Sequence, residues 1–212
     1  MFTHYRTRGL IFKKEDRGEV NQLFTVYTKD FGKLEILGKA IRKISSKLRP
    51  GAEVFYLSEI EFIQGKTYKT LTDAILIEKF ENIRTDLKRL RIAYKIFGIL
   101  DNLIRGQEPD EKIWHLLKET LRKLNKLEAI GAKLELLYYY FFWNLVSLLG
   151  YQPELRPDSI CGKQIDTDLA KILKIIIKKD WQVLSRLKIT PIHLKLLKNI
   201  SQWYNKEVCV ID

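Results

Sequence analysis

The sequence has few cysteines and no long apolar run. Only two of its 212 residues are cysteines, Cys161 and Cys209, too few for a disulfide framework or for a zinc site made of thiolates alone. No apolar run reaches the roughly 18 residues that a membrane-spanning helix needs, and the longest candidate, 136–150, is interrupted by Asn144 and Ser147. The opening stretch MFTHYRTRGL lacks the apolar segment of a signal peptide. We therefore expect a cytoplasmic protein with reduced thiols and no membrane contact.

Sequence signatures of catalysis are also absent. The chain has no G-x-x-x-x-G-K-[ST] phosphate loop, no G-x-G-x-x-G fingerprint, no H-E-x-x-H and no G-x-S-x-G. Its histidines, His4, His115 and His193, lie in unrelated segments without an acidic or cysteine partner at ligand spacing. Glu59 and Glu61 alternate with apolar residues, which is typical of the solvated face of a strand. We expect neither an enzyme nor a cofactor.

Basic residues are what the sequence has in excess. The 38 lysines and arginines exceed the 26 aspartates and glutamates by +12, and such an excess attracts polyanions through counterion release. Residues 29–49 hold seven basic and two acidic residues, a net +5 in 21 residues. Residues 81–212 hold 23 basic and 16 acidic residues in a more even spread. Their three small groups are Lys88, Arg89 and Arg91; Lys118, Arg122, Lys123 and Lys126; and Lys174, Lys178 and Lys179. These groups either form solvated helix faces, extend a DNA track or receive an acidic peptide tail.

The hydrophobic pattern changes near residue 80. Before it, short runs with a period of two, separated by turn residues, predict five strands at 7–14, 20–28, 33–41, 52–64 and 68–77, with a turn at 15–19. Five strands in about 80 residues suggest a small closed barrel of OB or SH3-like type. We therefore expect an α+β protein with a barrel domain at 1–80 and an all-helical domain at 81–212.

Beyond residue 80, apolar residues recur at helical spacing. They predict helices over about 83–100, 109–124 and 128–149, then one capped by Thr167-Asp168, one capped by Asp180 and one beginning at Thr190-Pro191. The aromatic run YYYFFW at 138–143 covers every side of its helix. That helix is therefore expected at the centre of the bundle, although some rings could line a groove for a partner's peptide.

The basic cluster after the third strand is the candidate binding site. Lys39, Arg42, Lys43, Lys47 and Arg49 stand there together with Ser45 and Ser46. A flexible cationic loop can follow a phosphodiester backbone without reading its sequence. The aromatic residues Phe24, Tyr27 and Phe31 lie nearby in the sequence. They would stack on unpaired bases if they faced outward, and would fill the barrel if they faced inward.

Several segments together resemble the RecO family of recombination mediators. The stretch RGEVNQLFTVYTKDFGKLEILGKAIRKISSKL (17–48) follows the family's order of G-E, a strand ending in Thr, G-K-L, A-K-G-A-R-R and S-R-L. The matching positions are Gly18-Glu19, Thr28, Gly32-Lys33-Leu34, Gly38-Lys39-Ala40, Arg42-Lys43 and Ser46-Lys47-Leu48. The segments 68–94, 108–121, LLGYQPEL (148–155) and QWYNKEV (202–208) also fit. Each motif is only moderately specific, and the argument lies in their common order and spacing.

This resemblance implies an OB-fold barrel, a helical domain and a function without catalytic turnover. Such proteins bind single- and double-stranded DNA and anneal complementary strands. With RecR they relieve single-strand-binding protein, which carries an acidic C-terminal tail, so that RecA loads. On this chain the implied phosphate contacts are Lys39, Arg42, Lys43 and Lys47, with a second tier of Arg8, Arg17 and Lys33. A cytoplasmic, nucleoid-associated location follows.

One departure from the family pattern concerns zinc. Many members open a zinc site with C-x-x-C-G after the G-Y-x-P-x-L segment, whereas here Asp158 stands at the first cysteine and only Cys161-Gly162 fits. At most two ligands can be found where a tetrahedral site needs four, so we expect no metal.

Two other functions stay open: a basic OB protein that binds RNA, and an adaptor whose charge receives only the acidic protein tail.

Overall fold

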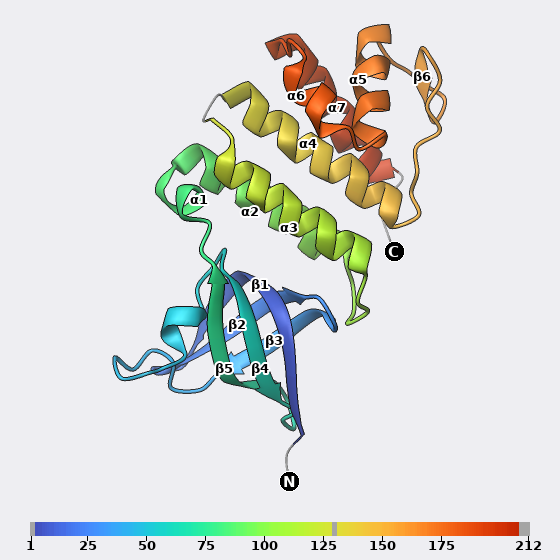
Figure 1. Cartoon of the computed structure of the whole chain (residues 1–212). Coiled ribbons are helices and arrows are strands. Elements are labelled where there is room, and N and C mark those ends of the chain that lie inside the picture. The colour runs from blue at the N-terminus through green and yellow to red at the C-terminus, as the bar shows by residue number, and fades with distance from the viewer. Residues whose placement is uncertain (1–2, 129–130, 208–212) are drawn as a thin grey trace. The chain divides into compact units, whose positions relative to one another are not determined.

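The computed structural model describes residues 3–128 and 131–207, which form two compact units (Figure 1). The barrel unit contains the chain up to Thr85 together with Ile104–Lys118. The helical unit contains Asp86–Leu103 and the chain from Glu119 onward. The domain boundary expected at residue 80 stays a prediction.

Five strands close the barrel. They are β1 (His4–Arg17), β2 (Asn21–Thr28), β3 (Gly32–Gly38), β4 (Leu57–Ile63) and β5 (Lys69–Glu78). Their order is β1-β2-β3-β5-β4, with β4 paired back onto β1 and only the β3–β5 pair parallel. A five-stranded Greek-key barrel of this kind is the OB fold. The predicted fold class, an OB barrel followed by helices, is confirmed.

Strand β1 belongs to both sides of the barrel. Residues 4–10 pair with β4 and residues 9–17 pair with β2, with a register shift between Ile11 and Lys13. A bulge of this kind bends the strand and increases its twist. Near the bend, a Cβ on Gly9 would lie 2.5 Å from Val26 Cγ1 and 2.8 Å from Ile60 Cδ1. Because only glycine tolerates so close an approach, Gly9 lets β1 curve across the core.

The predicted strand 52–64 is wrong in its first five residues. The strand begins only at Leu57, and residues 52–56 form a turn in which Phe55 has a φ of 65°. The Phe55 N–H donates to Ile11 O at 2.7 Å, and the Ile11 N–H donates to Tyr56 O at 3.1 Å. The turn therefore satisfies the backbone of Ile11 at the bulge of β1, and this tertiary contact overrides the local alternation.

Three other strand boundaries differ from the prediction by three residues each. β1 extends over residues 4–17 rather than 7–14, because the corner is made by Gly18, whose φ is 69°. The predicted turn at 15–19 therefore lies partly within β1. β3 ends at Gly38 rather than at residue 41, since Ile41 leaves the strand and enters the core from the following loop.

The helical predictions are confirmed with small changes. The helices are α1 (Glu81–Thr85), α2 (Leu87–Leu103), α3 (Glu111–Lys126), α4 (Gly131–Leu148), α5 (Thr167–Ile177), α6 (Trp181–Arg186) and α7 (Pro191–Glu207). The predicted helix 83–100 is split between α1 and α2 at Asp86, whose side chain accepts the Arg89 N–H at 2.9 Å. Asp166, rather than Thr167-Asp168, caps α5, whereas Asp180 caps α6 as expected. None of the helices in the described residues combines the length and apolarity needed to cross a membrane.

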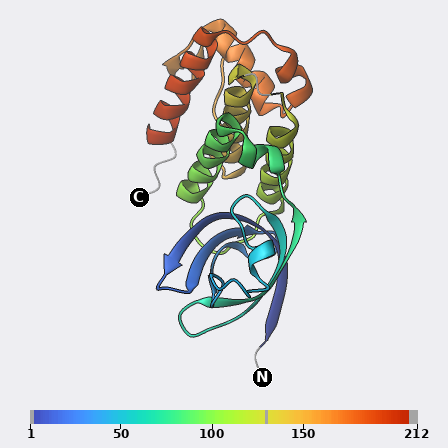
Figure 2. The same cartoon turned by 90° about the vertical axis from the view of Figure 1, so that its left-hand side faces the viewer.

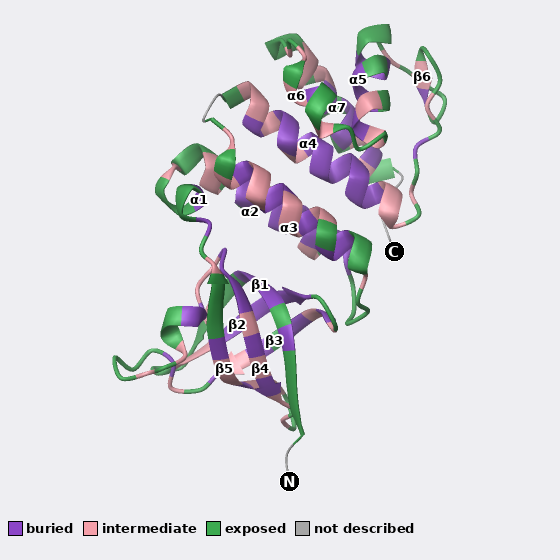
Figure 3. Ribbon diagram, in the orientation of Figure 1, coloured by how far each residue is buried: buried purple, intermediate pink, exposed green. Residues whose placement is uncertain are grey.

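Helix α4 lies at the centre of the helical unit, as Figure 3 shows by its burial. It packs against α2, α5 and α7. In the aromatic run 138–143 only Tyr138 is half-buried, and the other five rings are buried. Trp143 packs against Tyr204 of α7, with ring centroids 4.8 Å apart. The expectation that this run fills the core is confirmed, and three of its rings, Tyr138, Tyr139 and Phe142, also line a pocket.

Candidate nucleic-acid interface

We call residues 39–48, which follow β3, the cationic loop. Apolar side chains fasten it to the barrel at both ends, because Ile41 is 1% exposed within the barrel core and Leu48 packs against the same core. The Ala40 N–H donates to Asn21 Oδ1 at 2.8 Å, which fixes the start of the loop to β2. The loop is thus held at defined points rather than trailing in solvent.

The basic side chains of this region point away from the core. Lys39, Arg42, Lys43, Lys47 and Arg49 are all exposed. Arg42 contacts Asp16 at 3.1 Å and Gly18 O at 3.4 Å. The other four have no ion-pair partner among residues 3–128 and 131–207. Their positive charge is therefore available to a polyanion, since an exposed ion pair such as that of Arg42 is weak and easily exchanged.

Arg49 begins η1 (Arg49–Gly51), a short 3-10 helix beyond the loop. A Cβ on Gly51 would lie 1.9 Å from Ala74 O, so the backbone of η1 touches β5 directly. The Ser58 hydroxyl donates to Gly51 O at 2.6 Å and adds a second attachment. Figure 2 shows η1, in cyan, in front of the barrel. Its contacts with β5 and Ser58 anchor the chain directly after the cationic loop.

The second tier of predicted contacts is divided between the two ends of the barrel. Arg17 lies at the end of β1 that carries the loop, close to Asp16 and its partner Arg42. Lys33 lies at the other end of β3, which is roughly 20 Å away at about 3.3 Å per residue. Arg8 is next to Gly9, which pairs with Thr28 at that far end. The structure therefore groups Arg17 with the cationic loop but not Arg8 or Lys33.

Of the two orientations left open for Phe24 and Tyr27, the structure shows the inward one. Phe24 is 1% exposed in the barrel core, and Tyr27 is fully buried against Trp114 with ring centroids 6.5 Å apart. Burial raises the pKa of Tyr27 to about 12. Phe31 is half-buried and meets the ring of Tyr5 edge-on at 5.8 Å, so it helps to cover one end of the barrel core.

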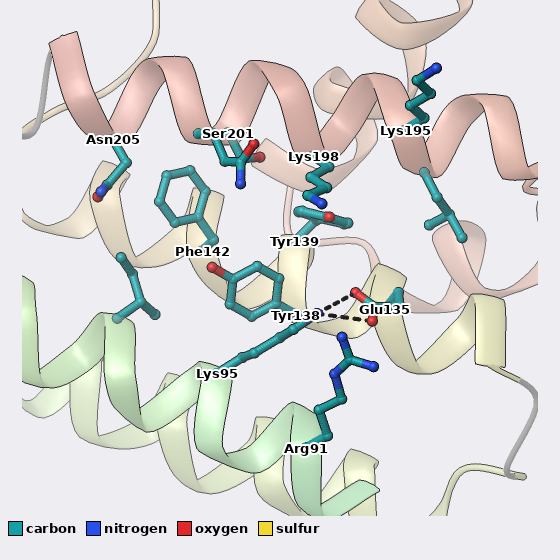
Figure 4. Close-up of a pocket in the computed structure, with 13 residues that line it drawn as sticks. Arg91, Lys95, Glu135, Tyr138, Tyr139, Phe142, Lys195, Lys198, Ser201 and Asn205 are labelled. Carbon is teal, nitrogen blue, oxygen red and sulfur yellow. Dashed lines mark hydrogen bonds and ion pairs between the residues drawn. The ribbon is translucent and has the colours of Figure 1, made fainter. Parts of the chain in front are cut away.

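A pocket of about 440 Å³ opens within the helical unit between α2, α4 and α7 (Figure 4). Its apolar wall is made by Tyr138, Tyr139 and Phe142 of α4. Lys95 lies in it with its ammonium group 2.9 Å from Glu135 and 5.6 Å from the centre of the Tyr138 ring. An aromatic wall beside paired charges gives the site both an apolar and a polar side.

Three further cations border this pocket: Arg91 from α2, and Lys195 and Lys198 from α7. They have no ion-pair partner in the described part of the chain. Two polar atoms in the lining, Ser201 Oγ and Asn205 Oδ1, are buried and lack a hydrogen-bond partner. Since buried polar groups are normally paired, these two atoms are open to a hydrogen bond with water or a ligand in the pocket. The three cations give the rim of the pocket a positive charge.

The sequence pattern missed most of this pocket. Of its cations, only Arg91 stood in one of the basic groups noted above. Lys195, Lys198, Ser201 and Asn205 recur at three- and four-residue spacing on α7, which is the one signal that could have placed them on one face.

Lys174 and Lys178 line a second groove of about 570 Å³ beside α5. Arg89 is part-buried and bonded to Leu127 O, so it is a structural residue.

The segment that resembles half of a zinc site is a β-hairpin. Its strands are β6 (Ser159–Ile160) and β7 (Lys163–Gln164), joined by Cys161 and Gly162, whose φ angles of 47° and 79° suit a two-residue turn. Lys163 Nζ lies 4.5 Å from the centre of the Trp203 ring. No group of three or more His, Cys, Asp or Glu residues suited to a metal occurs in residues 3–128 and 131–207, and Cys209 lies outside them. The donors present at the hairpin therefore do not fit zinc. That the protein binds no zinc stays a prediction.

Comparisons with known proteins identify the family. The model described as "Recombination protein O N terminal" matches residues 1–80, and the one described as "Recombination protein O C terminal" matches residues 84–171. The chain belongs to the RecO family. The boundary between the two matches coincides with the change from strands to helices, and the RecO pattern noted in the sequence is thereby confirmed.

Curated relatives carry the same family name. The chain is 30% identical over 158 residues to "DNA repair protein RecO" of Roseiflexus sp. (strain RS-1), covering 74% of this chain and 54% of that one. It is 32% identical over 162 residues to the protein of that name from Moorella thermoacetica, covering 76% and 58%. For Acetivibrio thermocellus the identity is 25% over 232 positions, covering 96% and 91%. The matched region thus spans little more than half the length of the first two relatives.

Proposed function

We propose that this RecO-family chain acts in DNA repair and recombination by binding single- and double-stranded DNA through the cationic loop and annealing complementary strands. The observation that carries this proposal is the arrangement of Lys39, Lys43, Lys47 and Arg49, which are exposed and have no ion-pair partner in the described residues. Basic side chains on a fastened loop contact phosphates without selecting a sequence.

Annealing is a task that this surface suits. Two complementary strands repel each other through their phosphates, so a protein that neutralises both backbones lowers the barrier to pairing. The base edges must remain free, which excludes a deep binding slot. A loop that is fastened to the barrel by Ile41 and Leu48 and exposes its cations meets both conditions. Neither task requires catalytic groups, and we propose no enzymatic activity.

The test is binding of a fluorescent single-stranded oligonucleotide, followed by anisotropy at about 100 mM salt. The variant Lys39→Ala/Arg42→Ala/Lys43→Ala is expected to bind about tenfold or more weakly and to anneal more slowly. Its matched control is Arg186→Ala/Lys188→Ala/Lys206→Ala, which removes two lysines and one arginine, all exposed, from the helical unit. Equal affinities of the two triple variants would refute a role for the loop. A preference of the wild type for structured RNA over single-stranded DNA would favour the RNA-binding alternative instead.

The partners follow from the same proposal. We place the acidic C-terminal tail of single-strand-binding protein in the pocket between α2, α4 and α7, and we expect RecR to act with this chain so that RecA loads. Support for the tail comes from three cations without ion-pair partners and an aromatic wall around buried, unpaired Ser201 Oγ. A peptide with carboxylates and one apolar side chain matches both sides of this pocket. Such a function agrees with a cytoplasmic, nucleoid-associated location.

Binding of a labelled acidic peptide that carries one aromatic residue tests this assignment. Arg91→Ala/Lys198→Ala is expected to lower peptide affinity about tenfold, whereas Arg186→Ala/Lys188→Ala removes the same residue types outside the pocket and serves as control. If both double variants bind the peptide like the wild type, the tail does not bind in this pocket. If the loop variant leaves DNA binding unchanged while the pocket variant abolishes peptide binding, the protein is an adaptor only.

A further inference from the structure

The tip of the cationic loop carries an apolar side chain in full contact with solvent. Ile44 is 96% exposed, more than any other large hydrophobic residue in the described part of the chain. Isolated exposed apolar residues are common on protein surfaces and need no explanation by themselves. Ile44 differs in its neighbours, because Arg42 and Lys43 precede it and Lys47 follows within three residues.

The backbone of the loop fixes the position of Ile44. The Arg42 N–H donates to Val20 O at 3.1 Å, the Lys43 N–H donates to Ala40 O at 3.1 Å, and the Ser46 N–H donates to Lys43 O at 3.0 Å. These bonds bracket Ile44 in two consecutive turns, between Ile41 and Leu48, which pack in and against the barrel core. Much of the entropy of ordering the tip is therefore lost on folding and not on binding.

We propose that Ile44 is a wedge that enters between two neighbouring bases of bound single-stranded DNA and unstacks them. This inference rests on the proposed DNA binding by the loop and deepens it. Proteins insert isoleucine and other apolar side chains between base steps of duplex DNA and partly unstack them, and the proposal extends this action to a single strand. Lys43 directly precedes Ile44, Lys47 follows it by three residues, and both are exposed. In the proposed complex these two long, flexible cations hold the phosphates on either side of the opened step.

Unstacking of bases is a conformational step that phosphate contacts by the loop cations do not bring about. Phosphate contacts neutralise a strand but leave its bases stacked or folded on one another. An unstacked step presents base edges to an incoming complementary strand, so the wedge would start the pairing that the cations permit. The ligand class is therefore a flexible single strand with at least one stacked base step.

The experiment uses a single-stranded oligonucleotide that contains 2-aminopurine, whose fluorescence rises on unstacking. At saturating protein, the wild type is expected to raise this fluorescence, and Ile44→Ala to reduce the rise at least twofold while anisotropy affinity falls only a few fold. Ile44→Leu should restore the rise. Leu87→Ala, an 83% exposed residue on α2, is the matched control and should behave like the wild type.

The outcomes separate the wedge from the binding proposal. If the wild type binds without a fluorescence rise, or if Ile44→Ala gives the full rise, the wedge is wrong while DNA binding by the loop stands. If Lys39→Ala/Arg42→Ala/Lys43→Ala binds DNA like the wild type, the binding proposal itself is wrong. Ile44→Ala should leave the melting temperature unchanged, and a clear decrease would show a packing role and overturn the inference.

Discussion

The cationic loop and the pocket of the helical unit carry charge of the same sign but are built in opposite ways. In the loop, apolar residues such as Ile41 point inward and the cations stand on an outward-facing surface. In the pocket, cations border a hollow whose wall is part of the buried helix α4. The loop therefore suits a long, repetitive polyanion, whereas the pocket suits one short ligand that fits its aromatic wall.

The two sites should also differ in how strongly substitutions there affect the stability of the fold. The loop cations contact little protein, so removing them should leave the fold intact. The pocket wall consists of side chains that also hold α4 against its neighbours, so a change there affects folding and binding together. Experiments that measure both properties for the same variants test this contrast.

The largest expected effect is on the stability of the pocket wall. Phe142 is 1% exposed and lines the pocket. Phe142→Ala should lower the free energy of unfolding by about 3–5 kcal/mol, because it removes a buried ring and leaves a cavity. Urea denaturation measures this value. Lys39→Ala/Arg42→Ala/Lys43→Ala should change it by less than about 1 kcal/mol, and a comparable loss in both variants would remove the contrast.

A smaller effect of opposite sign is expected at Ser201. Its Oγ is buried without a hydrogen-bond partner, a condition that costs roughly 1–3 kcal/mol. Ser201→Ala should therefore stabilise the free protein by about 1 kcal/mol and weaken binding of the acidic peptide several fold. Thermal unfolding with and without peptide measures both. A variant that is destabilised would mean that the hydroxyl already has a partner within the folded chain.

The smallest effect concerns the start of the cationic loop. Ala40 has a φ of 53°, a left-handed conformation that costs a non-glycine residue roughly 1–2 kcal/mol. Ala40→Gly relieves this cost but adds freedom to the unfolded chain, so a net stabilisation of about 0.5–1 kcal/mol is expected. Ala40→Val should destabilise. If the two variants unfold at the same temperature, the strained turn does not set the loop's geometry.

Much of the fold could be predicted because it depends on local patterns. Leu34 and Ile36 alternate with exposed or half-buried residues and are both in the barrel core, and Asp180 caps its helix as expected. The turn at 52–56 could not be predicted, because its cause is the bulge at Ile11, some 40 residues away in the sequence. Local alternation holds no information about such a contact.

One part of the candidate site could be predicted from the sequence and another part could not. The cationic loop was visible in the sequence because its basic residues lie close together between Lys39 and Lys47. The pocket was not, because Arg91, Tyr138 and Lys198 come from three helices that meet only after folding. The inward orientation of Phe24 was also undecided, since alternation on a strand does not say which face is the interior.

The salt dependence of DNA binding tests most directly whether the cationic loop contacts phosphates. In a plot of the logarithm of the association constant for single-stranded DNA against the logarithm of salt concentration, the slope is about −0.7 for each phosphate neutralised. If Lys39, Arg42 and Lys43 each contact a phosphate, their triple alanine variant should have a slope about 2 smaller in magnitude than the wild type. Arg186→Ala/Lys188→Ala/Lys206→Ala should keep the wild-type slope. Parallel lines for the wild type and the loop variant would contradict DNA binding by the cationic loop.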